Sequence, residues 1–158
     1  MTVPWQVYLE KYRGIKEIPG PKSNPIIDHF ASFTTLRSTS DEIPWCSSAM
    51  CAAMEEGAGI GSTKSAAARS WISWHNGVRL KGPCVGAIVI FNRGGSDDPT
   101  KDGPGHVSCV KAFGRLDMDC VGGNQGDTIK DSWYGYDNVL AWVWPKDFPL
   151  PEGAEVIP

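Results

Sequence analysis

The fold class depends most on residues 86–91, which read GAIVIF. After the glycine, the apolar and partly β-branched run at 87–91 is typical of a short, buried strand. Upstream of this run, apolar residues recur at the spacing of helices, whereas downstream they occur in short stretches with strand character. Helices followed by strands indicate an α+β domain with an antiparallel sheet.

Helices are expected upstream of that point. Residues 3–13 carry apolar side chains at helical spacing, and Asn24-Pro25 is a typical helix start. A third helix should occupy about 44–56, because it opens with a proline, is rich in Ala, Met and Glu, and is followed by Gly57. Residues 66–74 form a plausible fourth helix.

Strands are expected downstream, at 87–91, 106–113, 116–121 and 139–144. The loop at 92–105, rich in Gly, Asp and Pro, is the longest break in this half. A chain of 158 residues is long enough for one domain with a proper core and short for two. We therefore expect a single domain over 1–158, with its core at about 5–145 and an irregular tail over 146–158.

The composition argues against several classes of function. The net charge is −3 and charges of both signs are mixed, so the chain has no basic stripe for nucleic acid. No apolar run approaches the length of a transmembrane helix, which predicts no membrane insertion. The N-terminus lacks the basic start and apolar stretch of a signal peptide, so we expect a product made without an ordinary cleaved signal.

The five cysteines are an odd number in a chain that we expect to be made without export, which favours reduced thiols over disulfides. No Cys-x-x-Cys pair occurs, and the spacing of Cys46 and Cys51 is unusual for zinc ligands, so we expect no metal. Three further cysteines lie in or beside the expected strands and are most simply core residues: Cys84, Cys109 and Cys120.

Cys46 has the most favourable position for chemistry. It lies in the first turn of the helix expected at 44–56, where free backbone N–H groups and the helix dipole favour an anion. Such surroundings lower the pKa of a thiol and produce the thiolate, the form that attacks carbonyls. Cys51 is the rival nucleophile, but it lies more than one turn inside the helix and on a more polar face. The alternative for Cys46 is a small core residue packed on the sheet.

A cysteine hydrolase also needs a base, and three histidines are available. His29 lies beside the apolar stripe of the second helix and His75 lies where the fourth helix should end, so structural roles fit both better. His106 follows a glycine-rich turn at 103–105 and should stand at the mouth of a strand, where a substrate has room to approach. Its position fits a catalytic base and a half-exposed strand histidine equally well.

A third group must hold the base in the right tautomer. Asn124 follows the strand expected at 116–121 and is the natural candidate, with Asp127 as the fallback. Because asparagine after two glycines is also a turn sequence, a purely structural role for Asn124 stays open. Gln125 is an alternative, as a donor to an oxyanion.

Together these motifs resemble a known family. They occur in the order seen in small papain-like peptidases of the bacterial cell wall: Trp45-Cys46-Ser47, Gly86–Phe91, Gly105-His106-Val107 and Gly122-Gly123-Asn124-Gln125. The chain resembles a CHAP-type (cysteine, histidine-dependent amidohydrolase/peptidase) domain, especially the compact single-domain versions found as phage endolysins. Residues 14–20 and 68–71 also resemble that group, so the resemblance covers about 5–145. One departure is Ala87, where the family usually has Asp after the glycine; it removes no proposed catalytic residue.

The resemblance implies a papain-like fold, in which the cysteine helix packs on an antiparallel sheet. It also implies Cys46 as the nucleophile, His106 as the base and Asn124 as the group that orients the base. The reaction expected from it is cleavage of an amide bond in the peptide stem of peptidoglycan, which lyses the bacterial cell wall.

Substrate contacts, partners and compartment follow from the same resemblance. The side chains expected to contact the substrate are Trp45, Glu42, Trp71 and Gln125, with Trp133-Tyr134 as a further pair. Core roles for the aromatic residues are the alternative. The expected partner is bacterial peptidoglycan, bound by a monomer without a cofactor or a separate wall-binding domain. We expect synthesis in the cytoplasm of the producing cell and action on the wall, in the periplasm, after release.

Two other functions stay open. One is a secreted antibacterial wall-amidase toxin with the same chemistry. The other is a non-catalytic module that binds peptidoglycan.

Overall fold

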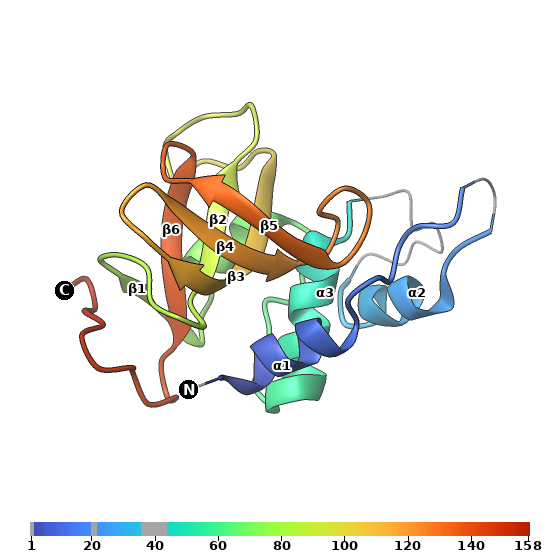
Figure 1. Cartoon of the computed structure of the whole chain (residues 1–158), viewed down its shortest axis with the longest axis horizontal. Coiled ribbons are helices and arrows are strands. Elements are labelled where there is room, and N and C mark those ends of the chain that lie inside the picture. Colours follow the sequence, from blue (N-terminus) through green and yellow to red (C-terminus); the bar gives the residue numbers. More distant parts are fainter. Residues whose placement is uncertain (1, 20–21, 36–43) are drawn as a thin grey trace.

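The helices lie together on one side of an antiparallel sheet (Figure 1). The computed structural model describes residues 2–19, 22–35 and 44–158. The helices are α1 (Pro4–Lys11), α2 (Pro25–Ala31), α3 (Cys46–Ala52), the π-helical turn η1 (Ala53–Gly57) and the 3₁₀ helix η2 (Ala68–Ser73). The strands are β1 (Gly77–Leu80), β2 (Ile88–Asn92), β3 (Gly105–Phe113), β4 (Asp117–Gly122), β5 (Lys130–Gly135) and β6 (Val139–Pro145). The predicted α+β class with an antiparallel sheet is confirmed.

The first two helices begin as their sequences predict. Pro4 opens α1, where the missing backbone N–H has no partner to lose. The Asn24 side chain caps α2 by accepting a hydrogen bond from the N–H of Ile26 at 2.9 Å. Helices this short are stabilised by what they bury, and they bury Trp5 in α1 and Phe30 in α2 completely.

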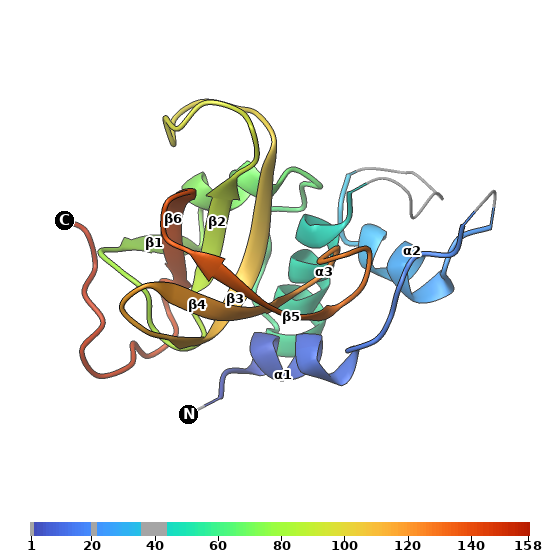
Figure 2. The same cartoon turned by 45° about the horizontal axis from the view of Figure 1, so that its top comes forward.

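Helix α3 is buried on every side. All 7 of its residues are buried, and it lies between the sheet and the other two α-helices (Figure 2). It begins at Cys46 and passes into η1, so the α-helix is shorter than the predicted 44–56. Its polar face is satisfied inside the protein, where Ser47 Oγ donates to the carbonyl of Ser65 at 2.7 Å and accepts from Trp71 Nε1 at 2.9 Å.

The sheet has the strand order β1-β6-β2-β3-β4-β5, and all neighbours are antiparallel. The expected strands correspond to β2, β3, β4 and β6, whereas β1 and β5 were not predicted. These two are the edges of the sheet, and they mix polar and apolar side chains because one face of each stays near water. The helix expected at 66–74 is the 3₁₀ helix η2.

The stretch at 86–91 forms the centre of the sheet. Residues 88–90 of β2 are fully buried between β3 and β6. Gly86, just before the strand, has a φ of +92°, and a Cβ there would lie 2.9 Å from Val3 Cγ2. The carbonyl of Gly86 accepts a hydrogen bond from Trp5 Nε1 at 2.7 Å. A glycine is therefore needed where α1 meets the start of β2.

Residues 146–158 form no further helix or strand, as expected for the tail. A single β-bridge between Leu80 and Val156 attaches them to β1. Within the described ranges, the chain contains no helix that is both long and apolar enough to cross a membrane.

Candidate active site

His106 is the second residue of β3, where that strand lies opposite the end of β2. The preceding Gly105 has no room for a side chain, since a Cβ would lie 2.9 Å from the carbonyl oxygen of Phe91 and 3.2 Å from Arg69 Cγ. The glycine lets the two strands approach closely, and His106 is only 1% exposed. The histidine thus stands at a strand end, as predicted, but it is buried.

The Nε2 atom of His106 faces a buried glutamine. It lies 2.9 Å from Oε1 of Gln125, which also accepts a hydrogen bond from Ser108 Oγ at 2.7 Å. The Gln125 amide nitrogen donates to the carbonyls of Cys120 and Lys130, at 3.1 and 2.6 Å. Both amide hydrogens are therefore used, and Oε1 acts only as an acceptor. His106 Nε2 must carry the proton, which fixes the tautomer of the imidazole.

The other ring nitrogen, Nδ1, is available as a base. It is buried and has no hydrogen-bond partner in the described part of the chain. Burial, together with the nearby Arg93 cation, outweighs the hydrogen bond to Gln125 and lowers the pKa of His106 from 6.5 to about 4. The imidazole is therefore neutral at pH 7 and keeps a bare lone pair on Nδ1.

Cys46 lies on the facing element, at the start of α3. Burial raises the pKa of its thiol above 9.0, while the N–H groups of Val107 and Ser47 and the charge of Arg93 oppose that rise. The expectation of a lowered pKa at the helix start is wrong, because Cys46 is only 5% exposed and desolvation dominates. Because the backbone N–H of Val107 lowers the pKa of this thiol, the sulfur must lie against the backbone of β3 next to His106.

The thiol of Cys46 and the imidazole of His106 lie on packed elements but are not hydrogen-bonded to each other. Both residues lie in the part of the chain that the structure describes, and no hydrogen bond joins Cys46 Sγ to either ring nitrogen of His106. Both groups are neutral in this state. Proton transfer from sulfur to Nδ1 therefore requires the two groups to move into hydrogen-bonding distance.

Asn124 and Asp127 lie in the turn after β4, with φ values of 55° and 62°. No hydrogen bond joins either side chain to His106, because Gln125 occupies that position. The turn packs directly on α3, since a Cβ on Gly123 would lie 2.8 Å from an alanine side chain of that helix. The side chain hydrogen-bonded to Nε2 of His106 is thus that of Gln125, and Asn124 lies beside it in the same turn.

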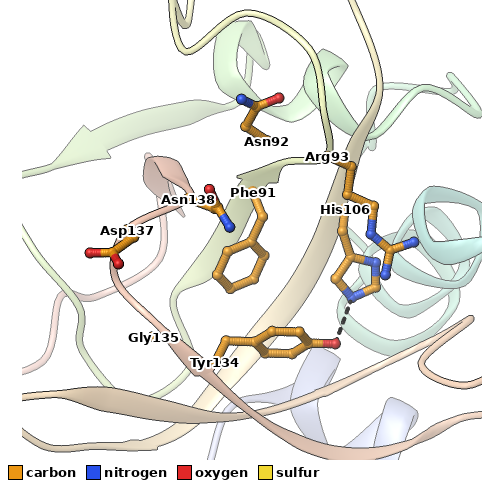
Figure 3. A pocket seen from close by; sticks show the side chains of 8 residues that line it. All are labelled: Phe91, Asn92, Arg93, His106, Tyr134, Gly135, Asp137 and Asn138. Carbon is orange, nitrogen blue, oxygen red and sulfur yellow. Dashed lines mark hydrogen bonds between the residues drawn. The ribbon is translucent and has the colours of Figure 1, made fainter.

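A pocket of about 290 Å³ opens beside the imidazole (Figure 3). It is lined by Phe91, Asn92, Arg93, His106, Tyr134, Gly135, Asp137 and Asn138. The rings of Phe91 and Tyr134 flank the imidazole, with centroids 6.1 and 5.7 Å from it. The Tyr134 hydroxyl lies 3.5 Å from Nε2 of His106. Cys46 does not line this pocket, which therefore reaches the imidazole and not the sulfur.

Arg93 is one of the residues of this site that the sequence does not predict. It follows β2 directly, and Figure 3 shows its side chain beside the imidazole of His106. Its charge lowers the pKa of Cys46, His106 and Tyr134 alike, although burial has a larger effect on each. No motif marks this arginine, because its place at the site depends on how the end of β2 lies against β3.

The loop that carries Arg93 is held by a second, buried arginine. Arg69 of η2 makes four hydrogen bonds of 2.7 to 3.2 Å to this loop. Its acceptors are Asn92 Oδ1 and the carbonyls of Ser96, Lys101 and Pro104. The loop at 92–105 is therefore a fixed wall beside the site.

Of the described residues that were expected to contact the substrate, only Tyr134 lines the pocket. Trp45 and Trp71 are buried, and each donates its Nε1–H to an acceptor inside the protein. Gln125 is buried beneath the imidazole, with all its hydrogen bonds made within the protein. Glu42 lies outside the described residues. Of the Trp133-Tyr134 pair, only the tyrosine lines the pocket, and the tryptophan is exposed.

The side chains of the other cysteines and histidines do not line the pocket. Cys51 is fully buried, and burial raises the pKa of Cys84 to about 11 and that of Cys120 to about 12. His29 pairs with a glutamate on the surface, and His75 is exposed in a turn. Among the described residues, no group of three or more His, Cys, Asp or Glu side chains is arranged to hold a metal.

Comparisons with known proteins do not assign a family. The chain matches no protein-family model, no curated protein and no solved structure. The candidate site is therefore defined by its own geometry, a thiol and a neutral imidazole on facing elements with a glutamine that fixes the tautomer.

Proposed function

We propose that this protein is a cysteine hydrolase with a papain-like fold, in which Cys46 is the nucleophile, His106 is the base and Gln125 orients the base. The observation that carries the proposal is the fixed tautomer of His106, with its proton on Nε2 and a bare, buried Nδ1. Thiol hydrolysis needs a base held in this way beside the nucleophile. The resemblance implies Asn124 as the residue that orients the base, and we assign this role to the neighbouring Gln125 instead.

The proposed reaction starts from neutral groups, because the pKa of the thiol is raised and that of the imidazole is lowered. Nδ1 of His106 takes the thiol proton as Sγ of Cys46 attacks the amide carbonyl and the C–S bond forms. Backbone N–H groups near the sulfur, including that of Cys46, stabilise the negative charge on the carbonyl oxygen. The C–N bond breaks as the leaving amine takes the proton from Nδ1. Water, activated by the same nitrogen, then hydrolyses the thioester.

The substrate that we propose is an amide bond in the peptide stem of bacterial peptidoglycan, cleaved by an endolysin-like enzyme that lyses the cell wall. The support is the order of the motifs around Cys46, His106 and Asn124-Gln125, which resembles that of CHAP-type endolysins. The pocket beside the base adds support, because its mixture of aromatic walls and a few polar groups suits part of a peptide.

Digestion of purified Gram-negative peptidoglycan tests this function. The wild type, Cys46→Ala and Cys51→Ala are incubated with the same material, and new amine termini are identified by mass spectrometry. We expect the wild type to release one class of terminus, which identifies the bond cut. Cys46→Ala should lose at least about 1000-fold in rate because the nucleophile is gone. Cys51→Ala is the matched control, a buried cysteine of the same helix, and should stay active; full activity of Cys46→Ala would contradict the mechanism.

The second candidate function is a module that binds peptidoglycan without cleaving it. It is favoured by the burial of Cys46, which neither lines the pocket nor hydrogen-bonds to His106. A wild-type protein that sediments with peptidoglycan but releases no termini from it would support this function. A secreted wall-amidase toxin would use the same site as a lysin, and an adjacent immunity gene is the observation that would favour it.

A further inference from the structure

An arginine side chain lies beside the proposed base. Arg93 lines the pocket together with His106, and its side chain extends along the imidazole (Figure 3). Its backbone N–H donates to the carbonyl of Pro104 at 3.2 Å, which fixes the start of the side chain. Within the described ranges, its guanidinium has neither a hydrogen bond nor an ion pair. This group can therefore take up an incoming partner without losing an existing one.

Two other arginines show what a structural role looks like in this protein. Arg69 is buried and makes four hydrogen bonds to the loop beside the site. Arg13 is half-exposed, and its Nε and Nη2 bind both oxygens of Asp131 at 3.0 and 3.1 Å. Among the described residues, Arg93 has no such partner, and its positive charge lowers the pKa of both Cys46 and His106. Its position points to a ligand rather than to the fold.

We propose that Arg93 binds a free carboxylate of the substrate close to the scissile amide, so that the enzyme selects acidic peptides. This inference rests on the proposed hydrolase function. A guanidinium binds a carboxylate through two parallel hydrogen bonds, which gives both energy and orientation. An amide positioned for attack must have its carbonyl carbon against Cys46 Sγ and its nitrogen near His106 Nδ1, so a carboxylate a few bonds away comes within reach of Arg93.

The rest of the pocket agrees with such a ligand. Phe91 and Tyr134 offer apolar rings for the carbon chain that joins the carboxylate to the amide. Asp137 also lines the pocket and would repel an anion, but Figure 3 shows it at the end opposite to Arg93. The anionic group is therefore expected at the Arg93 end.

The test uses synthetic stem peptides in matched pairs that differ only by a carboxylate or a carboxamide, on either side of the bond that is cut. The ratio of kcat/KM within each pair is measured for the wild type, Arg93→Gln, Arg93→Lys and Arg115→Gln. Arg115→Gln removes the same charge from an exposed turn between β3 and β4 and is the control. We expect the wild type to prefer one carboxylate by about 10- to 100-fold, the range for a hydrogen-bonded charged group.

In Arg93→Gln this preference should fall to about one, in Arg93→Lys it should be intermediate, and in Arg115→Gln it should persist. The side of the scissile bond on which the carboxylate changes kcat/KM, acyl or amine, is the side that Arg93 contacts. Equal turnover of both members of every pair by the wild type overturns the inference. So does an Arg93→Gln variant that is slower on both members but keeps the preference, because Arg93 would then act on the thiol and imidazole alone.

A binding experiment separates this inference from the proposed function. Calorimetry with Cys46→Ala, with and without Arg93→Gln, measures the affinity for the same peptide pairs without turnover. If the wild type cleaves nothing and yet Cys46→Ala binds the acidic peptide in an Arg93-dependent way, the hydrolase proposal fails and the carboxylate site stands. If neither binding nor turnover distinguishes carboxylate from carboxamide, the carboxylate site fails whatever the enzyme cleaves.

Discussion

Two polar clusters involve the same three strands, β3, β4 and β5, together with Gln125 in the turn after β4 and Arg13 after α1, and they are built in opposite ways. The cluster around Gln125 is buried and consists of neutral groups, each with one donor or acceptor role. The cluster around Asp131 is partly exposed and consists of charges, with Arg13 at 3.0 Å and Lys111 at 2.6 Å. Water can replace a lost partner in the second cluster but not in the first. The neutral cluster should therefore contribute more to stability than the charged one.

The largest effect is expected for Gln125→Leu, which keeps the volume and removes every hydrogen bond of the amide. The Nε2–H of His106, the hydroxyl of Ser108 and two backbone carbonyls lose their partner inside the protein. The free energy of unfolding in urea should fall by about 3–5 kcal/mol. The kcat/KM of the proposed hydrolysis should fall at least about 100-fold, because the tautomer is no longer fixed.

The control for this variant is Asn124→Gly, which suits the positive φ of that position and removes the neighbouring amide. It should leave kcat/KM within about threefold of the wild type, since the structure gives Asn124 no bond to His106. A larger loss of activity in Asn124→Gly than in Gln125→Leu would mean that Asn124, rather than Gln125, orients the imidazole of His106.

The next effect is a pH dependence of stability that originates in His106. Its pKa is 6.5 when exposed and about 4 in the fold, because burial disfavours the charged form. The unfolded chain therefore binds the proton first as the pH falls. Stability should be level above pH 6.5 and should decrease from there toward pH 4, by about 3 kcal/mol in total. Urea titrations at half-unit pH steps measure this slope, and His106→Gln should remove it between pH 6.5 and 4.5.

A smaller effect is expected for Ser108→Ala. The change removes one of the two hydrogen bonds to Oε1 of Gln125 but leaves the imidazole with its partner. Unfolding in urea should show a loss of about 1 kcal/mol, and activity should remain within about tenfold of the wild type. A loss as large as that of Gln125→Leu would mean that Ser108, rather than the amide of Gln125, holds the cluster together.

The sequence predicts features that depend on neighbours in the chain. Asn24 caps α2 as expected, and the run at 87–91 forms a central strand because its apolar, β-branched side chains favour that structure. His106 stands at a strand end, as expected, because a glycine-rich turn precedes it. These features follow from local conformation, which one segment specifies largely by itself.

Other features depend on packing between distant segments, and the sequence does not predict them. Whether Asn124 or Gln125 points at the imidazole depends on the conformation of the turn after β4, in which Asn124, Gly126 and Asp127 all have positive φ. The pKa of Cys46 follows its burial, which α1, α2 and the sheet produce together. Arg93 reaches the site only because β2 ends beside β3, and the edge strand β5 lacks the apolar pattern of a buried strand.

The smallest effect is expected for Asp131→Asn, which removes a formal charge from the exposed cluster. Burial opposes ionisation there, but hydrogen bonds from Lys111 and Arg13 hold the pKa of Asp131 below 3.8. The carboxylate therefore contributes stability above pH 3.8 that is lost as the pH falls below that value. Because its side chain is 32% exposed, water and salt screen the pairs, and the loss at pH 7 should be below about 1 kcal/mol. In 0.5 M NaCl the loss should shrink further, whereas that of Gln125→Leu should not change. A larger loss for Asp131→Asn than for Gln125→Leu, in the same urea titrations, would show that the charged cluster rather than the neutral one holds these strands together.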